Sequence, residues 1–322
     1  PTYGREQVLL DTIEQFIVQR PRAREVLVLD QTARHEGGTT KRLHELDTDG
    51  HIQWIRMDRP SQPRALNTAL RHANTRIVLF VDDDVRIGPD FVGTHWAAYS
   101  DPSVWAVAGQ VLQPGQAVRE EPSMNRGSGA LADLDFPFNY GVRCFVENGM
   151  SGNLSVRRER ALQVGGFDEQ FYPPVSYRFD AELCKRLVRA DGRILFEPSA
   201  RIHHLRARSG GTRSQGSHMT SCSAIHGVGD YYFALRQPLG PEVLCYIARR
   251  PFREVMTRFH LTHAWWIPVK LLGEVRALLQ AARLARRPPS LLRLEDSSDG
   301  RKSAAARLKT HHETKCPSER AS

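Results

Sequence analysis

The stretch that decides the fold is Arg76-Ile77-Val78-Leu79-Phe80-Val81-Asp82-Asp83-Asp84, where an apolar run leads directly into three acids. A short and continuously apolar run is typical of a strand that is buried on both faces, as strands of parallel sheets are. Such folds bind their ligands at the carboxyl ends of the strands. The three carboxylates therefore stand where a binding site is expected.

Outward from this run, the chain alternates between strand and helix patterns. Apolar residues at the helical period predict helices over 8–18, 65–73, from Pro89 onward, 159–164 and 180–190. Short apolar runs predict strands over 25–30, 51–55, 104–111, 153–156 and 193–196. A polar loop is expected after Asp30 through Gly38, and a long mobile loop over 114–139. The alternation predicts an α/β fold with a mixed, mainly parallel sheet and helices on both faces.

Three adjacent carboxylates repel one another, so a cation or a cluster of donors must offset that repulsion. Mg²⁺ and Mn²⁺ prefer carboxylate oxygens and keep positions open for phosphates. The acids at 82–84 therefore predict a divalent-metal site. A solvated acidic turn or a helix N-cap is the alternative, since aspartate suits both.

Composition sets the wider limits. The chain has 322 residues, 40% of them hydrophobic, which is enough for a large buried core. Its net charge of +9 favours an acidic partner, which can be nucleic acid, an anionic membrane or a phosphorylated small molecule. Five cysteines without a C-x-x-C pair favour a reducing compartment. We expect no transmembrane run, and we expect a strand before the loop-like opening at Pro1.

The predicted organisation is a catalytic domain over 1–215, a helical region over 216–294 and a disordered tail over 295–322. Residues 268–287 form a predicted basic amphipathic helix, with Leu271, Leu272, Val275, Leu278, Leu279 and Ala282 on its apolar face. This helix either lies on an anionic membrane or packs on the catalytic domain. The neighbouring Trp265-Trp266 pair favours the membrane.

Four segments, taken together and in order, resemble family 2 glycosyltransferases. They are Pro1-Thr2-Tyr3 with 28–30, 64–70 with the acids at 82–84, 149–157 with 165–169, and 180–183 through Pro198 to His204. The resemblance covers residues 1 to about 210 and implies a GT-A, Rossmann-like fold with a C-terminal helical appendage. It also implies an inverting transferase, similar to rhamnosyltransferases, that uses a nucleotide-diphosphate sugar in cell-wall or other surface polysaccharide synthesis.

The resemblance further implies roles for individual residues. Thr2, Tyr3 and Asp30 would hold the nucleotide base, and Arg64 would lie near the base or the diphosphate. Asp82 and Asp83 would contact the donor, while Asp84 and His204 would bind Mn²⁺ or Mg²⁺. Gly149 and Asn153 would line the donor-sugar and acceptor site. Asp180 would be the general base that takes the proton of the acceptor hydroxyl.

Each of these residues has a structural alternative. Asp180 can stabilise the start of a helix, and the histidines at 203 and 204 can be buried strand residues. Gly149 can serve a turn or let the substrate approach, and Asn153 can anchor its own loop. Two positions depart from the family pattern: Phe179 stands where an acid is usual, and Gln31-Thr32 follow Asp30 where an acid and a serine are common.

Three other functions compete with this hypothesis. A sugar nucleotidyltransferase would need a glycine-rich loop, which the opening segment lacks. A non-catalytic donor-binding or membrane-scaffold homologue is favoured by Phe179 and opposed by Asp82, Asp84, Asp180 and His204. A nucleic-acid binder is suggested by charge alone, and we expect none. We expect a glycan or lipid-linked acceptor and a cytoplasmic location, including the inner face of the plasma membrane.

Overall fold

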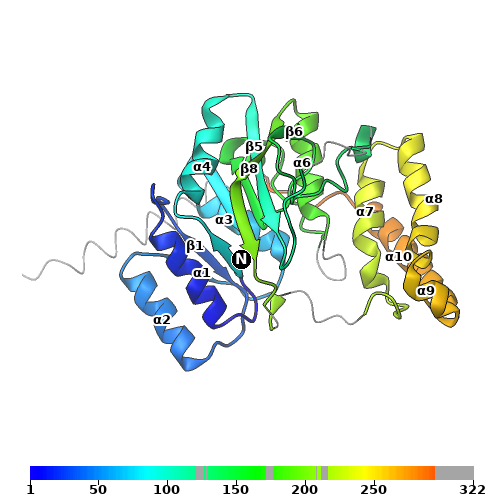
Figure 1. The fold of residues 1–322 in the computed structure, drawn as a ribbon, viewed down its shortest axis with the longest axis horizontal. Helices are drawn as coiled ribbons and strands as arrows, with labels where there is room; N and C mark the ends of the chain where they lie inside the picture. Colours follow the sequence, from blue (N-terminus) through cyan, green and yellow to red (C-terminus); the bar gives the residue numbers. More distant parts are fainter. Residues whose placement is uncertain (121–125, 128, 172–176, 208, 212–216, 294–322) are drawn as a thin grey trace, which may run out of the picture.

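The computed structural model describes residues 1–120, 126–127, 129–171, 177–207, 209–211 and 217–293. Figure 1 shows an α/β body, with strands between helices, and a separate group of helices at the right. The predicted tail over 295–322 lies outside the described residues.

The main sheet is mixed. In spatial order its strands are β3 (Ile77–Val81), β7 (Asn153–Arg157), β5 (Val104–Leu112), β8 (Arg193–His204) and β4 (Val85–Ile87), and β6 (Cys144–Val146) also pairs with β8. The mixed α/β fold is confirmed, but antiparallel pairs predominate: among the described strands of this sheet, β5–β8 is the only parallel pair of neighbours. The reason is that β7 lies between β3 and β5, and the described residues that lead from β5 to β7 form no crossover α-helix of the kind that a parallel neighbour usually needs.

A second, two-stranded parallel sheet is formed by β1 (Leu27–Asp30) and β2 (Gln53–Arg56). It packs with α1 (Gln7–Ile17) and α2 (Gly37–Thr48) around Leu9, Ile13, Val28, Leu43 and Leu46. The loop expected after Asp30 ends earlier than predicted, because α2 already begins at Gly37.

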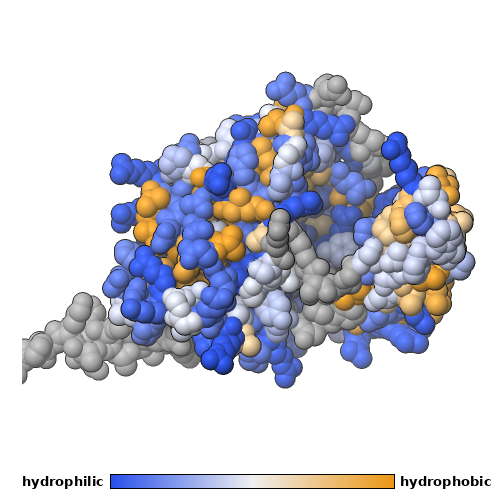
Figure 2. All heavy atoms as spheres, turned by 60° about the horizontal axis from the view of Figure 1, so that its bottom comes forward, coloured by the Kyte–Doolittle hydropathy of each residue, from blue (hydrophilic) through white to orange (hydrophobic). Residues whose placement is uncertain are grey.

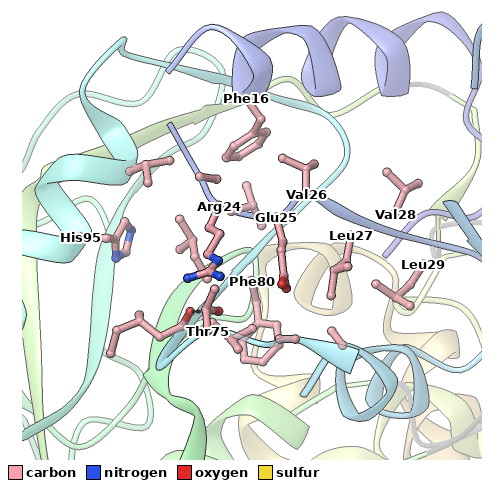
Figure 3. A pocket seen from close by; sticks show the side chains of 18 of the residues that line it. Phe16, Arg24, Glu25, Val26, Leu27, Val28, Leu29, Thr75, Phe80 and His95 are labelled. Carbon is pink, nitrogen blue, oxygen red and sulfur yellow. Dashed lines mark hydrogen bonds between the residues drawn. The ribbon is translucent and has the colours of Figure 1, made fainter. Parts of the chain in front are cut away.

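A cavity of about 590 Å³ lies between β1 and β3 (Figure 3). Consecutive residues of both strands line it, 26–29 on one side and 77–81 on the other. Because successive side chains of a strand point to opposite faces, this lining means that the cavity follows the edges of the two strands. Phe16, Phe80 and other apolar side chains cover it, and Pro1 is also among the lining residues.

In the described part of the chain, four helices cover the main sheet: α3 (Gln62–His72), α4 (Phe91–Ala97), α5 (Arg158–Gln163) and α6 (Phe179–Arg189). Their positions confirm the helices predicted from periodicity. Ser61 caps α3 by accepting a hydrogen bond from the Arg64 amide, and a proline follows in the first turn. The short 3₁₀ segments are η1 (Ala98–Ser100), η2 (Gly129–Leu131), η4 (Ala224–His226) and η5 (Ala264–Trp266).

The described part of the 114–139 loop is not a solvated lid. Leu134 and Phe136 are only 6% exposed, as is the following Tyr140. The Phe136 ring lies 4.9 Å from the ring of Phe196 on β8, edge to face. This part of the predicted mobile loop is therefore anchored in the core by a few apolar residues, although the loop is polar in overall composition.

The helical region contains α7 (Val228–Arg236), α8 (Pro241–Val255), α9 (Arg258–Thr262) and α10 (Ile267–Ala285). The helix predicted over 268–287 is confirmed, but its buried face was predicted wrongly. α10 buries Lys270, Gly273, Glu274, Ala277 and Ala281, while Leu272, Val275 and Leu279 are 46%, 55% and 55% exposed. Small residues face α7 because the two helices lie close, so that a Cβ at Gly227 would stand 2.8 Å from the Ala277 Cβ.

Candidate active site

The acids at 82–84 form the connection between β3 and β4. Pairing of the strands brings their partners to them: Val81 stands opposite Asn153 in β7, and Val85 stands opposite His204 in β8. His204 points inward because burial alternates along the end of β8, where His203 is exposed. The sheet therefore places His204 beside an acidic motif that precedes it by about 120 residues.

The ligand atoms of Asp82, Asp84 and His204 all lie within 4.8 Å of one another. His204 Nε2 is 3.3 Å from an Asp84 oxygen and 3.5 Å from an Asp82 oxygen. Two carboxylate oxygens and one imidazole nitrogen are a donor set that suits Mn²⁺ and accepts Mg²⁺. These residues fit a divalent cation.

Arg5 is a residue that sequence reasoning left without a role. Its side chain is 4% exposed and donates to Asp84 Oδ2 over 3.1 Å and to Asp83 over 3.4 Å. The Ala207 amide donates to the same Asp84 oxygen over 2.8 Å, which leaves Oδ1 turned toward His204. Burial raises the pKa of Asp83, and the charge of Arg5 opposes this rise. The signal available in the sequence was a single arginine in the short loop that the resemblance places at the donor site.

Asp180 and Asp82 are joined through two consecutive residues. The Ser151 amide donates to Asp180 Oδ2 over 3.1 Å, and the Gly152 carbonyl accepts from the Asp82 amide over 3.3 Å. A Cβ at Gly152 would stand 2.3 Å from Asp82 Oδ2, so this backbone passes directly against the carboxylate. The structure thus brings the predicted base and the predicted metal site to opposite sides of one tight turn.

The pKa of Asp180 is raised by burial, and the amides of Ser151 and Ala181 and the charge of Arg178 oppose this rise. A carboxylate with a raised pKa is a better proton acceptor, which suits a general base. Phe179 points the other way, is 4% exposed and lies 6.0 Å from the ring of Phe167. The departure at Phe179 therefore falls on a core position and leaves the site-facing acid intact.

The predicted base-binding residues are close to one another, because Thr2 and Asp30 form a parallel bridge. Asp30 itself is fully buried, and its oxygens accept from the Thr32 amide, the Trp54 indole and the His35 ring. Tyr3 is 42% exposed. Asp30 thus shapes the loop that follows it, and its direct contact with a base stays a prediction.

The remaining predicted residues have different surroundings. Arg64 is half-buried and pairs with Asp58 over 2.9 Å. Asn153 is fully buried, where its amide donates to the carbonyls of Gln110 and Ala200 and contacts His95. This geometry favours the anchoring alternative for Asn153.

Gly149 is also explained by packing. A Cβ on this glycine would stand 2.8 Å from a Leu154 methyl group and 3.0 Å from the sulfur of Cys184. The space that the glycine leaves free is thus filled by the core, not by a substrate. Packing thus explains why residue 149 is a glycine, and its contact with the donor sugar stays a prediction.

Solved structures with the same fold bind nucleotide sugars. A mannosyltransferase of Pyrobaculum calidifontis, in complex with GDP-Man and Mn²⁺, is similar over 96% of this chain and 79% of its own, with 21% identity and a TM-score of 0.51. TarS 1–349 of S. aureus, in complex with UDP-GlcNAc, is similar over 88% and 80%, with 15% identity and a TM-score of 0.56. These likenesses confirm the GT-A fold.

Curated relatives come from Mycobacterium tuberculosis. An N-acetylglucosaminyl-diphospho-decaprenol L-rhamnosyltransferase is 30% identical over 173 residues, which are 48% of this chain and 54% of the relative. A pre-mycofactocin glycosyltransferase is 28% identical over 143 residues, which are 44% of this chain and 29% of the relative. The chain thus spans about half the length of the first relative. The sequence profile of Glycosyl transferase family 2 matches residues 1–165, and the chain belongs to this family.

Proposed function

We propose that this chain transfers a sugar from a nucleotide-diphosphate sugar to a hydroxyl acceptor, with inversion at the anomeric carbon. The observation that carries the proposal is the metal-ligand group of Asp82, Asp84 and His204, with Asp180 held across the Ser151–Gly152 turn. A metal site beside a carboxylate of raised pKa supplies both halves of the reaction, departure of a diphosphate and removal of a proton.

In this mechanism Asp82, Asp84 and His204 would hold Mn²⁺ or Mg²⁺, which neutralises charge on the leaving diphosphate when bound. Arg5 and the Ala207 amide keep the Asp84 carboxylate turned toward that position. Asp180 accepts the proton of the acceptor hydroxyl while the oxygen of that hydroxyl bonds to the anomeric carbon. The bond from that carbon to the diphosphate oxygen breaks on the opposite face, and the configuration inverts.

The names of similar proteins support the class of donor and acceptor. The Pyrobaculum mannosyltransferase is described with GDP-Man and Mn²⁺, and TarS with UDP-GlcNAc. The Mycobacterium relative is named for L-rhamnosyl transfer to a decaprenol-linked sugar. We therefore propose a nucleotide-sugar donor and a lipid-linked or glycan acceptor in cell-surface glycan synthesis.

The experiment is transfer and donor hydrolysis across a panel of nucleotide sugars, measured by release of nucleoside diphosphate, with and without Mn²⁺ or Mg²⁺. We expect turnover of one donor that requires the metal and is lost in Asp84→Ala. Asp90→Ala is the matched control, because Asp90 is an exposed acid of the segment after β4. Release of pyrophosphate would show a nucleotidyltransferase instead, and metal-dependent donor binding without turnover would show a non-catalytic homologue.

We also propose that the helical region rests on an anionic membrane at the cytoplasmic face. Large apolar side chains are exposed where α8 leads into α9 and η5: Phe252 is 66% exposed, Met256 76%, Leu261 75% and Trp265 66%. Arg249, Arg253 and Arg258 are exposed in the same segments. Figure 2 shows hydrophobic patches, in orange, beside hydrophilic ones, in blue, on this group of helices at the right. Exposed apolar side chains flanked by arginine are typical of contact with anionic lipid.

Within the described residues every helix is too short or too polar to span a bilayer, so this contact would be peripheral. Sedimentation with vesicles of phosphatidylcholine, with and without phosphatidylglycerol, tests it. We expect binding that requires the anionic lipid and is lost in a Phe252→Ser, Trp265→Ser double variant. Trp96→Ser is the matched control, because Trp96 is 54% exposed on α4 of the α/β body. Equal binding of both variants would rule out this surface.

A further inference from the structure

A second cluster of buried charges lies away from the metal ligands, between α6 and the helical region. Its centre is Asp230 of α7, whose side chain is 5% exposed. Arg178 donates to Asp230 Oδ1 over 2.8 Å, and Arg250 of α8 donates to Oδ2 over 2.8 Å. The hydroxyl groups of Tyr177 and Tyr246 also donate to this carboxylate. One acid thus holds two guanidinium groups and two phenols in place.

Arg178 immediately precedes α6, the helix that carries Asp180 in its first turn. Its backbone is left-handed, with φ of +74°, which is costly for a residue other than glycine. The Arg178 carbonyl accepts from the Glu182 amide over 3.0 Å, and its Nη1 donates to the Leu134 carbonyl over 2.9 Å. The side chain therefore fixes the point at which the chain turns into α6.

The same cluster continues into α10. Arg250 also pairs with Glu274, and Lys270 pairs with Glu274 over 3.2 Å. The side chains of these three residues are each 2% exposed. Removing one partner of a buried ion pair costs a protein much stability, so these pairs hold α7, α8 and α10 together. The helical region is thereby fastened to the start of α6.

We propose that Asp230 is a positioning residue for Asp180, acting through Arg178. This inference rests on the proposed function of Asp180 as the base. Asp230 holds Arg178, Arg178 holds the left-handed turn before α6, and that turn sets where the Asp180 carboxylate meets the Ser151 amide. The helical region then has a role in transfer that is separate from any membrane contact.

The test compares Asp230→Asn with Glu274→Gln, using the full chain with its donor, metal and acceptor. Both variants remove one buried charge that contacts Arg250, but only Asp230 contacts Arg178. We expect Asp230→Asn to lower kcat at least tenfold while the KM for the donor changes less than threefold. Glu274→Gln should lower the Tm and leave the kcat of the folded protein within twofold. Equal effects of both variants on kcat would overturn the proposal.

Arg178→Gln gives the same test if Asp230→Asn does not fold, because Asp230 then keeps Arg250 as its partner. We expect the same loss of kcat, and a smaller loss in Arg178→Lys, which retains the charge. Unchanged kcat in Arg178→Gln would overturn the proposal. Asp180→Asn separates the two hypotheses: if it retains kcat, the proposed function fails, whereas if it loses kcat and Arg178→Gln does not, only the positioning role fails.

Discussion

The metal side and the base side of the site are built in different ways. On the metal side, Asp82 and Asp84 are separated by one residue in the sequence, and strand pairing adds His204. On the base side, Asp180 is a single acid whose place depends on a turn at 151–152 and on Arg178. The first half is a short motif on a sheet, whereas the second is an assembly of contacts between residues far apart in the sequence.

This difference shows where each half is vulnerable. The sheet register that places the metal ligands involves many backbone hydrogen bonds, so a single side-chain change removes a ligand without moving the others. The base is held by a few side chains, and substitutions in the helical region are expected to reach it. Substitutions on the two sides should therefore differ in how local their effects are.

The largest expected effect is on the base side. Asp180→Asn should lower kcat by roughly 10²- to 10⁴-fold, because the variant cannot accept the acceptor proton. Steady-state transfer assays measure this loss, and donor binding by calorimetry should be retained. Activity near that of the original chain would show that another group takes the proton.

The same variant has a predicted effect on stability. Burial raises the pKa of Asp180 above its ordinary value of 3.8, so the charged form opposes folding at neutral pH. That unfavourable contribution is present above the raised pKa and disappears as the pH falls below 3.8. Asp180→Asn should therefore have a Tm at pH 7 at least as high as that of the original chain, with the advantage fading toward acid pH. Thermal unfolding at several pH values measures it.

On the metal side, His204→Ala should lower kcat by about 10²- to 10³-fold, the usual cost of removing one group that stabilises developing charge. His203→Ala is the matched control, because the two histidines are adjacent in β8 and only His204 faces the acids. We expect the His203 variant to keep its activity and its response to Mn²⁺. An equal loss of kcat in both variants would show that damage to strand β8, and not loss of a metal ligand, causes the effect.

Arg5 should show a smaller effect, because it orients a ligand and is not one itself. Arg5→Lys keeps the charge but loses the planar fork that reaches both Asp83 and Asp84. We expect the Mn²⁺ concentration for half-maximal activity to rise by about 10- to 100-fold, the usual cost of losing a group that orients a metal ligand. Arg42→Lys, a surface pair with Glu14, should leave it unchanged. An unchanged metal requirement in Arg5→Lys would remove Arg5 from the site.

Sequence reasoning was most successful where the signal was local. The apolar run into Asp82 predicted both β3 and the acidic site, and helical periodicity predicted α1, α3, α6 and α10. The contacts of Arg5, Arg178 and Asp230 were not predicted, because each joins segments that are far apart in the sequence and that no sequence pattern links. The wrong face was assigned to α10 for a similar reason: its buried Lys270 and Glu274 pair with each other and with α8, which hydropathy alone cannot show.

The smallest and most distant effect concerns the cavity between β1 and β3, next to the metal side. Both strands turn an edge to it, and its lining is largely apolar. A six-residue extension of alternating valine and isoleucine before Pro1 is expected to pair with both edges and fill the cavity. We expect the Tm to rise by several degrees, at about 2 to 4 °C for each kcal/mol of added stability.

An extension of glycine and serine is the control, because it adds length without apolar side chains. A rise in Tm with the apolar extension alone would show that a strand belongs between β1 and β3. The metal side would then depend, as the base side does, on a segment far from it in the sequence. The same Tm with both extensions would show that the cavity has another occupant and that the contrast between the two sides holds.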